Sequence, residues 1–232
     1  MILIFDYFET LLNSTTLDFN LGLKEFWNGY YKDKCSFDEM KSYGEELFHL
    51  LMSKHRQGIE FPFVREELPM FAERFGGEKI TMSSAEEADF LMRCNNFELD
   101  SKVEELLRFC SQKNIPMYVL SNSGFSGGAL MEILNRYGIG KYIKKLWSSA
   151  DYGRVKPDRG LFEYAVNNAL ADNSGYTRED IFYIGDMYET DVTGASGIGI
   201  KSIWLNKKNG TDTEGLATHV VTSPEQIIGL LK

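Results

Sequence analysis

From residue 99 to the C-terminus, helical and strand-like segments alternate along the chain. Helical spacing of apolar residues predicts helices at 103–110, 129–137, 160–169 and 224–231, with a further helical stretch at 191–197. Short apolar runs predict strands at 115–120, 143–147, 181–184, 201–205 and 219–221. Such alternation is typical of a parallel sheet whose strands are joined by helical crossovers. We therefore expect an α/β fold.

Another buried strand is expected at the N-terminus, where an apolar run over residues 1–5 stops abruptly at Asp6. Short apolar runs bounded by a polar residue are typical of the central strands of a parallel sheet. Ligands of open α/β sheets bind beyond the carboxyl ends of the strands, so Asp6 is placed for chemistry. Asp is also a common turn former, and this simpler interpretation of Asp6 stays open.

Other strand-like stretches also carry polar residues at or near their ends. These residues are Ser121 and Asn122 after 117–120, Lys156 after Val155, and Asp186 and Asp191 after 181–184. Together with Asp6 they resemble, in order, the four motifs of the haloacid dehalogenase-like hydrolase superfamily. The resemblance implies a Rossmann-like parallel-sheet core and a hydrolase that acts through an aspartate.

The first motif departs from the family's usual pattern. In the phosphatase branch an apolar strand is followed by Asp-x-Asp-x-Thr, whereas this sequence reads Asp6-Tyr7-Phe8-Glu9-Thr10. Phe8 stands where the family's general acid usually lies. Glu9 is a conceivable substitute, but it lies one residue away from that position.

Between the first two motifs, residues 17 to 96 show no strand-like runs and carry apolar residues at helical spacing. We expect helices with apolar faces over 19–30 and 40–51, one over 63–71 that is interrupted or kinked at Pro69, and one that begins near Ser83. We divide the chain into a Rossmann-like core, residues 1–13 and 98–232, and an all-helical cap, residues 14–97. In similar family members such a cap closes over the site and contacts the substrate.

The resemblance implies a metal site and a nucleophile. Asp6 would attack phosphorus and form an aspartyl-phosphate intermediate; a carboxylate with an ordinary pKa near ~4 needs no base to activate it. Asp6, Asp186 and the backbone carbonyl of Phe8 would hold Mg²⁺, which prefers such oxygen ligands. Asp191 would orient the metal's waters or Lys156. A helix-capping role for Asp191 stays open.

The remaining motif residues are implied to bind the phosphate. Ser121 and the amide of Asn122 would contact a phosphate oxygen, and the charge of Lys156 would stabilise the nucleophile and the transferring group. Lys156 could instead be a solvent-exposed residue ahead of a helix.

Three functions are compatible with these residues. The first is a Mg²⁺-dependent phosphatase acting on a small phosphate ester, in which the absence of an acid at Phe8 favours acidic leaving groups. The second is a 2-haloacid dehalogenase, the metal-free branch in which an aromatic residue commonly occupies the Phe8 position. The third is a phosphate-binding or regulatory protein that has lost useful turnover.

Composition limits the partners and the compartment. The chain has 232 residues, 43% of them hydrophobic, enough for a sizeable core. Its net charge of -9 and the lack of a basic run argue against nucleic acid, and no apolar stretch approaches the ~18 residues of a membrane span. Cys35, Cys94 and Cys110 lie far apart, which suits free thiols in the cytoplasm. The natural substrate and the oligomeric state stay open.

Overall fold

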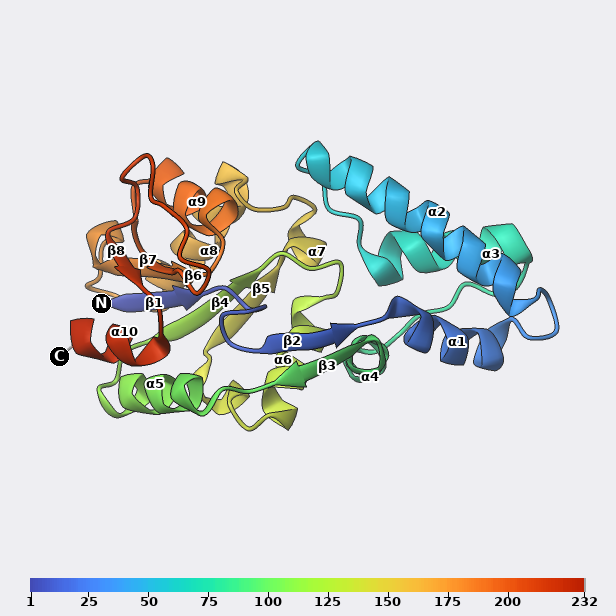
Figure 1. Cartoon of the computed structure of the whole chain (residues 1–232), viewed down its shortest axis with the longest axis horizontal. Coiled ribbons are helices and arrows are strands. Elements are labelled where there is room, and N and C mark those ends of the chain that lie inside the picture. The colour runs from blue at the N-terminus through green and yellow to red at the C-terminus, as the bar shows by residue number, and fades with distance from the viewer. Residues whose placement is uncertain (232) are drawn as a thin grey trace.

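The computed structural model describes residues 1–231, and its centre is a six-stranded parallel sheet (Figure 1). Each strand pairs in parallel with its neighbour. In spatial order the strands are β5 (Lys145–Ser148), β4 (Met117–Ser121), β1 (Ile2–Phe5), β6 (Ile181–Gly185), β7 (Lys201–Leu205) and β8 (His219–Val221). The predicted α/β fold is confirmed.

Helices cover both faces of this sheet, which explains why β1 is apolar at every position. Leu3 and Phe5 pack into one cluster with residues of three helices, whereas Ile2 and Ile4 pack into another on the opposite face. The first face is covered by α5 (Ser101–Gln112), α6 (Gly127–Arg136) and α10 (Pro224–Leu230), and the second by α8 (Arg159–Ala171) and α9 (Thr193–Gly197).

Several core segments differ from the expected boundaries. β4 begins at Met117 rather than at 115, and β5 begins at Lys145 rather than at 143, after the 3₁₀ turn Gly140–Tyr142. The predicted helical stretch at 191–197 begins earlier, as the π-helical turn Tyr188–Val192, and continues into α9. Asp191 therefore lies inside a helical turn, and its carboxylate also accepts from the N–H of Met187, the residue that precedes this turn.

The cap contains four α-helices, which lie beyond the carboxyl ends of the core strands (Figure 1). The third predicted helix begins as the π-helical turn Phe63–Glu67 (η1) and continues as an α-helix. Pro69 lies in the first turn of that helix, where its missing N–H costs no hydrogen bond, so it does not interrupt the helix. The helices are α1 (Phe19–Tyr30), α2 (Phe37–Arg56), α3 (Leu68–Phe75) and α4 (Ser84–Cys94).

A short antiparallel ribbon joins the cap to the core. β2 (Asn13–Leu17) pairs with β3 (Asn95–Glu98), and Asn13 lies opposite Glu98. The expectation that the cap, residues 14–97, is entirely helical is therefore wrong at its two ends, where the chain forms strands. Both strands are short and polar, so they lack the apolar alternation by which strands are found in a sequence.

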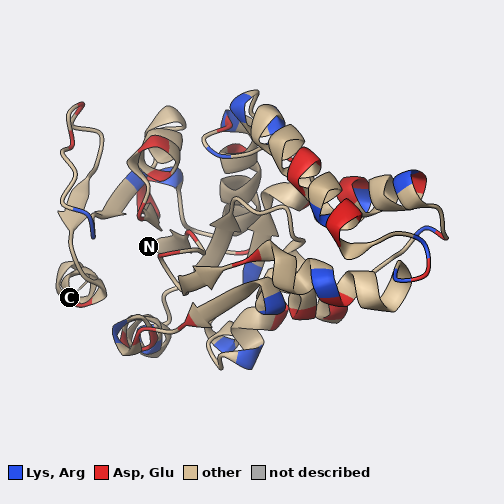
Figure 2. Cartoon of the chain, turned by 45° about the vertical axis from the view of Figure 1, so that its right-hand side comes forward, with Lys and Arg blue, Asp and Glu red and all other residues tan. Residues whose placement is uncertain are grey.

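Charged side chains of both signs are interspersed on the outer helices (Figure 2). Some of them link neighbouring elements: Arg93 of α4 pairs with Glu25 of α1, and Arg136 of α6 pairs with Asp89 of α4 at 2.5 Å. Within residues 1–231, the structure contains no helix with the length and apolar character needed to cross a membrane.

Candidate active site

Lys156 lies at the centre of a buried charge cluster at the sheet edge. Its Nζ donates to Asp6 Oδ1 at 2.6 Å, to Asp191 Oδ1 at 2.7 Å and to the hydroxyl of Tyr183 at 2.9 Å. The four residues come from the end of β1, the turn after β6, β6 itself and the loop before α8. Residues far apart in the sequence thus meet where the parallel strands end.

Asp6 continues the central strand by one residue. Its N–H donates to the carbonyl of Ile184 on β6 at 2.7 Å, so the backbone at Asp6 is fixed by the sheet. Asp6 Oδ1 is held by Lys156, whereas Oδ2 has a weaker contact, with the hydroxyl of Thr10 at 3.5 Å. One carboxylate oxygen is therefore firmly held and the other is nearly free.

Burial and mutual repulsion shape the charges of this cluster. Burial raises the pKa of Asp6 to about 7; Lys156 opposes this shift, and Asp191 adds to it. Burial by itself lowers the pKa of Lys156, but the carboxylates of Asp191 and Asp6 raise it well above its ordinary value. Burial raises the pKa of Asp186 to about 6, and Asp191 contributes to the increase. One ammonium group thus faces three carboxyl groups, an arrangement that further positive charge would stabilise.

Three carboxylates, those of Asp6, Asp186 and Asp191, offer oxygens that lie within 4.8 Å of one another. Both oxygens of Asp191 are engaged, one by Lys156 and the other by the N–H of Met187 at 3.0 Å. Among residues 1–231, no hydrogen bond is made to the Asp186 carboxylate. Hard oxygen donors with free lone pairs suit Mg²⁺, and Asp6 and Asp186 could hold it.

The carbonyl of Phe8 is a further oxygen near this cluster, because Phe8 lies two residues beyond Asp6. Within the described residues 1–231, the backbone carbonyl of Phe8 accepts no hydrogen bond. This carbonyl, the nearly free Oδ2 of Asp6 and the Asp186 carboxylate fit the same hard cation, so the residues present match the ligand set that the sequence suggests.

The side chain of Asn122 holds the backbone of Lys156 in place. Its Oδ1 accepts from the N–H of Lys156 at 2.6 Å, and its Nδ2 donates to the carbonyl of Lys156 at 3.3 Å. The side chain therefore fixes the backbone that carries the central lysine, whereas the sequence suggested a role only for the Asn122 amide. Ser121 is fully buried at the end of β4, beside Asn122.

Tyr183 is the site residue that sequence reasoning missed. Its hydroxyl accepts from Lys156 Nζ and donates to the carbonyl of Leu120 at 3.0 Å. In the sequence Tyr183 is one member of an apolar run. A buried tyrosine needs a hydrogen-bond partner, and that requirement was the available signal.

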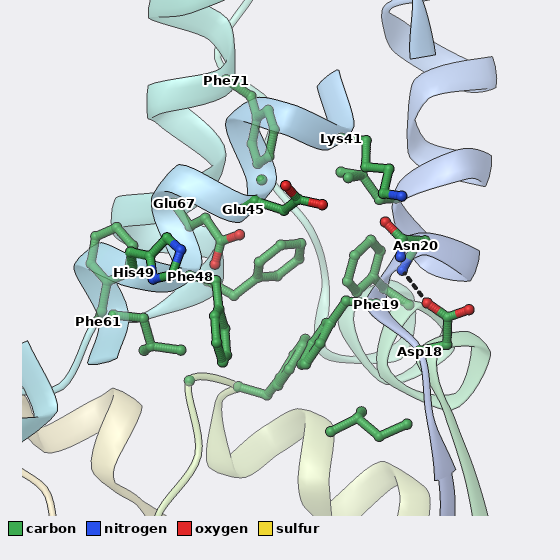
Figure 3. Close-up of a pocket in the computed structure, with 18 of the residues that line it drawn as sticks. Asp18, Phe19, Asn20, Lys41, Glu45, Phe48, His49, Phe61, Glu67 and Phe71 are labelled. Atoms are coloured by element: carbon green, nitrogen blue, oxygen red, sulfur yellow. Dashed lines mark hydrogen bonds between the residues drawn. The ribbon is translucent and has the colours of Figure 1, made fainter. Parts of the chain in front are cut away.

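A cavity of about 480 Å³ lies between the cap helices and the loop after β4 (Figure 3). Its walls are largely aromatic, and Gly124 and Phe125 of that loop form part of them. The polar side chains that line it are Asp18, Asn20, Lys41, Glu45, His49, His55 and Glu67. The cavity thus adjoins the loop that follows Ser121 and Asn122.

Residues 3–205 match the family described as haloacid dehalogenase-like hydrolase. The chain belongs to this family. The family match confirms the resemblance drawn from the motifs, and it includes both the core and the cap.

Individual members of the haloacid dehalogenase-like hydrolases give further comparisons. The pyrimidine 5′-nucleotidase YjjG of Escherichia coli is 32% identical over 120 residues, which are 51% of this chain and 50% of YjjG. The chain thus matches about half the length of that curated relative. A 2-haloacid dehalogenase from Pseudomonas syringae superposes with a TM-score of 0.66 at 20% identity, covering 100% of this chain and 98% of its own. The structure of the HAD-hydrolase YfnB of Bacillus subtilis bound to magnesium superposes with a TM-score of 0.61 at 18% identity, covering 100% of this chain and 98% of YfnB. These structural likenesses show the shared fold.

Within this family fold, Phe8 contributes a ring where phosphatases usually have an acid. The ring stacks on Phe97 of β3 at 6.1 Å between centroids and tilts against Tyr7 at 4.8 Å. The Glu9 carboxylate accepts from the N–H of Ser14 in β2 at 2.8 Å. Phe8 and Glu9 both tie the motif to the ribbon that leads into the cap.

Proposed function

We propose that this hydrolase is a Mg²⁺-dependent phosphatase that cleaves small phosphate esters through an aspartyl-phosphate on Asp6. The observation that carries the proposal is the excess of carboxylates around Lys156, with Asp186 and Asp191 beside Asp6. Displacement of halide from carbon does not need these extra acids, whereas a metal-assisted phosphoryl transfer does. The names of relatives, among them the YjjG nucleotidase, support phosphate esters as substrates.

In the proposed reaction, Asp6 attacks phosphorus and the bond from phosphorus to the leaving-group oxygen breaks. The leaving group departs with the electron pair. The Ser121 hydroxyl and the Asn122 amide donate to phosphate oxygens, and the Lys156 ammonium balances the charge on the nucleophile. Water then attacks phosphorus, which releases inorganic phosphate and restores Asp6. When bound, Mg²⁺ would neutralise charge on the phosphate.

The leaving group receives no proton from position 8, because Phe8 has none to give. Loss of a positioned general acid costs about 10²–10⁴-fold, and the cost is greatest for poor leaving groups. We therefore propose that aryl and acyl phosphates react faster than alkyl esters such as nucleoside monophosphates. Ordinary turnover of sugar phosphates would contradict this account of Phe8.

A second candidate is a 2-haloacid dehalogenase, and the specific observation in its favour is Phe8. An aromatic ring at this position suits a reaction in which halide leaves without a proton. In that reaction Asp6 would attack carbon and no metal would be needed.

We further propose that the protein acts on small molecules in the cytoplasm. Cys94 and Cys110 are buried free thiols and Cys35 is a partly buried one. Free thiols suit a reducing compartment.

The test is phosphate release from p-nitrophenyl phosphate with Mg²⁺ and with a chelator. We expect metal-dependent release that falls at least about 10³-fold in Asp6→Asn. Asp186→Asn should require far more Mg²⁺, whereas Asp38→Asn, at an exposed acid of α2, should behave as wild type. Release that persists in chelator or in Asp6→Asn would overturn the proposal. Halide release without phosphate release would establish the dehalogenase, and phosphate-analogue binding without either activity would establish a binding protein.

A further inference from the structure

Phenylalanine rings from separate elements form a wall of the cap cavity. The ring of Phe63 in η1 stacks on Phe90 of α4 at 4.4 Å and lies 5.2 Å from the ring of Phe125 in the core. Phe48 of α2 and Phe71 of α3 also line the cavity (Figure 3). Aromatic faces arranged in this way bind flat apolar groups well.

Glu67, at the end of η1, extends its carboxylate into this aromatic cavity (Figure 3). Among residues 1–231, neither a hydrogen bond nor an ion pair is made to that carboxylate. Burial alone raises its pKa to about 7. Glu67 is partly buried and faces the cavity, and a carboxylate set among apolar rings without a partner is unfavourable, so Glu67 lowers stability unless a ligand or another role compensates for it.

A neighbouring carboxylate shows what a structural acid looks like in this protein. Glu60 is also buried, but it accepts from the N–H of Phe61 at 2.9 Å and pairs with His55 at 2.7 Å, and it contacts Ser149. Its pKa is lowered: burial raises it, but these hydrogen bonds outweigh the burial. Glu67 has none of these contacts, which sets it apart as a binding group.

Other polar groups of the cavity are less available. Asp18 caps α1 by accepting from the N–H of Asn20, and His55 is paired with Glu60. Lys41, Glu45 and His49 also line the cavity, but these residues are exposed, so water already solvates them. Glu67 is the carboxylate that lies among the phenylalanine rings (Figure 3).

The cavity is linked to the proposed phosphate site through the backbone. The N–H of Phe63 donates to the carbonyl of Gly124 at 2.8 Å, and Gly124 lies two residues after Asn122. A phosphate held at Ser121 and Asn122 would therefore have its ester group near the cavity.

We propose that this cavity receives the leaving group of the ester, and that Glu67 selects flat aromatic leaving groups whose nitrogen donates hydrogen bonds, as an amidine or an amino-substituted heterocycle does. The inference rests on the proposed phosphatase function for its biological meaning. The rings hold the flat body, and the carboxylate accepts from the N–H groups. Glu67 thereby acts as a specificity-determining residue and takes no part in the bond-breaking step.

The first test uses benzamidine and benzamide, which share their shape but differ in charge and donors. Calorimetric titration at about pH 8, above the raised pKa of Glu67, keeps that carboxylate largely ionised. We expect the wild type to bind benzamidine at least about 10-fold more tightly than benzamide, because hydrogen bonds to a charged group are stronger than neutral ones. The preference should vanish in Glu67→Gln and persist in Glu73→Gln, an exposed acid of α3. An equal affinity for both probes, or a preference retained by Glu67→Gln, would overturn the inference.

Kinetics give the second test. The probes are 4-(aminomethyl)phenyl phosphate and 4-(hydroxymethyl)phenyl phosphate, whose leaving groups are similar in acidity. We expect kcat/KM to favour the amine, and Glu67→Gln to lower kcat/KM for the amine much more than for the hydroxymethyl ester, so that the preference is lost. A preference retained by Glu67→Gln would contradict the assignment. Benzamidine binding by Asp6→Asn does not depend on turnover, so failure of the phosphatase proposal can be told from failure of this one.

Discussion

The sheet edge and the cap cavity both place carboxylates beside apolar groups, but among residues 1–231 only those at the sheet edge are paired with a cation. Asp6 and Asp191 share the ammonium of Lys156 at 2.6 and 2.7 Å. Glu67 faces phenyl rings, and within residues 1–231 no cation pairs with it. A buried charge with a well-placed partner is tolerated, whereas one without a partner is costly.

This difference assigns different roles to the two regions: the sheet edge positions the reacting groups, and the cap cavity selects the ligand. The groups at the sheet edge are held by one another and by the strands, so their geometry exists before a substrate binds. The carboxylate in the cap gains its partner only from a ligand, so it discriminates among ligands. The core therefore determines the reaction, and the cap determines which group may be attached to the phosphate.

The largest effect is expected from removal of the shared cation. Lys156→Met leaves two buried carboxylates unpaired, which should lower the free energy of unfolding by about 3–5 kcal/mol. Phosphate release should fall by about 10²–10³-fold, because the charge on the nucleophile is no longer balanced. Urea unfolding and the p-nitrophenyl phosphate assay measure the two effects.

The matched control is Lys145→Met, which removes an exposed ion pair with Asp172. Exposed pairs contribute about 0–1 kcal/mol, so this variant should be nearly silent in both assays. Equal losses of stability and of phosphate release in the two variants would show that Lys156 contributes no more than an exposed lysine does.

A smaller effect of opposite sign is expected in the cap. The folded-state pKa of Glu67 is raised from 4.5 to about 7, so the folded chain binds more protons than the unfolded chain between these values. Stability should therefore fall as pH rises through this window, and the full penalty is present above it. Glu67→Gln removes the penalty and should raise the free energy of unfolding by about 1–2 kcal/mol near pH 8.

Urea unfolding of both proteins at each pH isolates this effect, since the other charged or titratable residues that line the cavity are the same in both: Asp18, Lys41, Glu45, His49 and His55. Below the unfolded-state pKa of Glu67, the Glu67→Gln substitution should not raise the free energy of unfolding. A loss of stability near neutral pH would mean that the Glu67 carboxylate makes favourable contacts in the folded chain.

A stability change of about the same size as that of Glu67→Gln, but in the direction of a loss, is expected at Tyr183. Tyr183→Phe deprives Lys156 of one acceptor and the carbonyl of Leu120 of its donor, at a cost of about 1–2 kcal/mol. Phosphate release should fall by about 3–10-fold, since Lys156 keeps both carboxylates. Tyr164→Phe, at an exposed position of α8, is the control. A loss as large as that of Lys156→Met would mean that Tyr183 takes part in the chemistry itself.

The positions of Asp6, Asp186 and Asp191 could be predicted from the sequence for a simple reason. Each follows a buried strand, and the carboxyl ends of neighbouring parallel strands meet at one edge. The contacts of Tyr183 and Asn122 could not, because they depend on which way a side chain points within a strand or loop.

The cap was harder to predict than the core. Helical spacing marks Phe63 and Phe71 as buried, but it does not say which helices they face. The placement of Glu67 among rings is thus invisible in the sequence. The ribbon of β2 and β3 was missed because Asn13–Leu17 is mostly polar and exposed.

The pairing of Asn13 with Glu98 makes the cap a replaceable module. The chain leaves and re-enters the core at one point, so a different segment could be grafted there without moving β1 or β4. Recognition of new leaving groups could then evolve by exchange of one continuous piece, while the nucleophile and its lysine are inherited unchanged. Phe8, stacked on Phe97 at this junction, and Phe125, whose ring lies 5.2 Å from that of Phe63, are among the core side chains that a graft would have to accommodate.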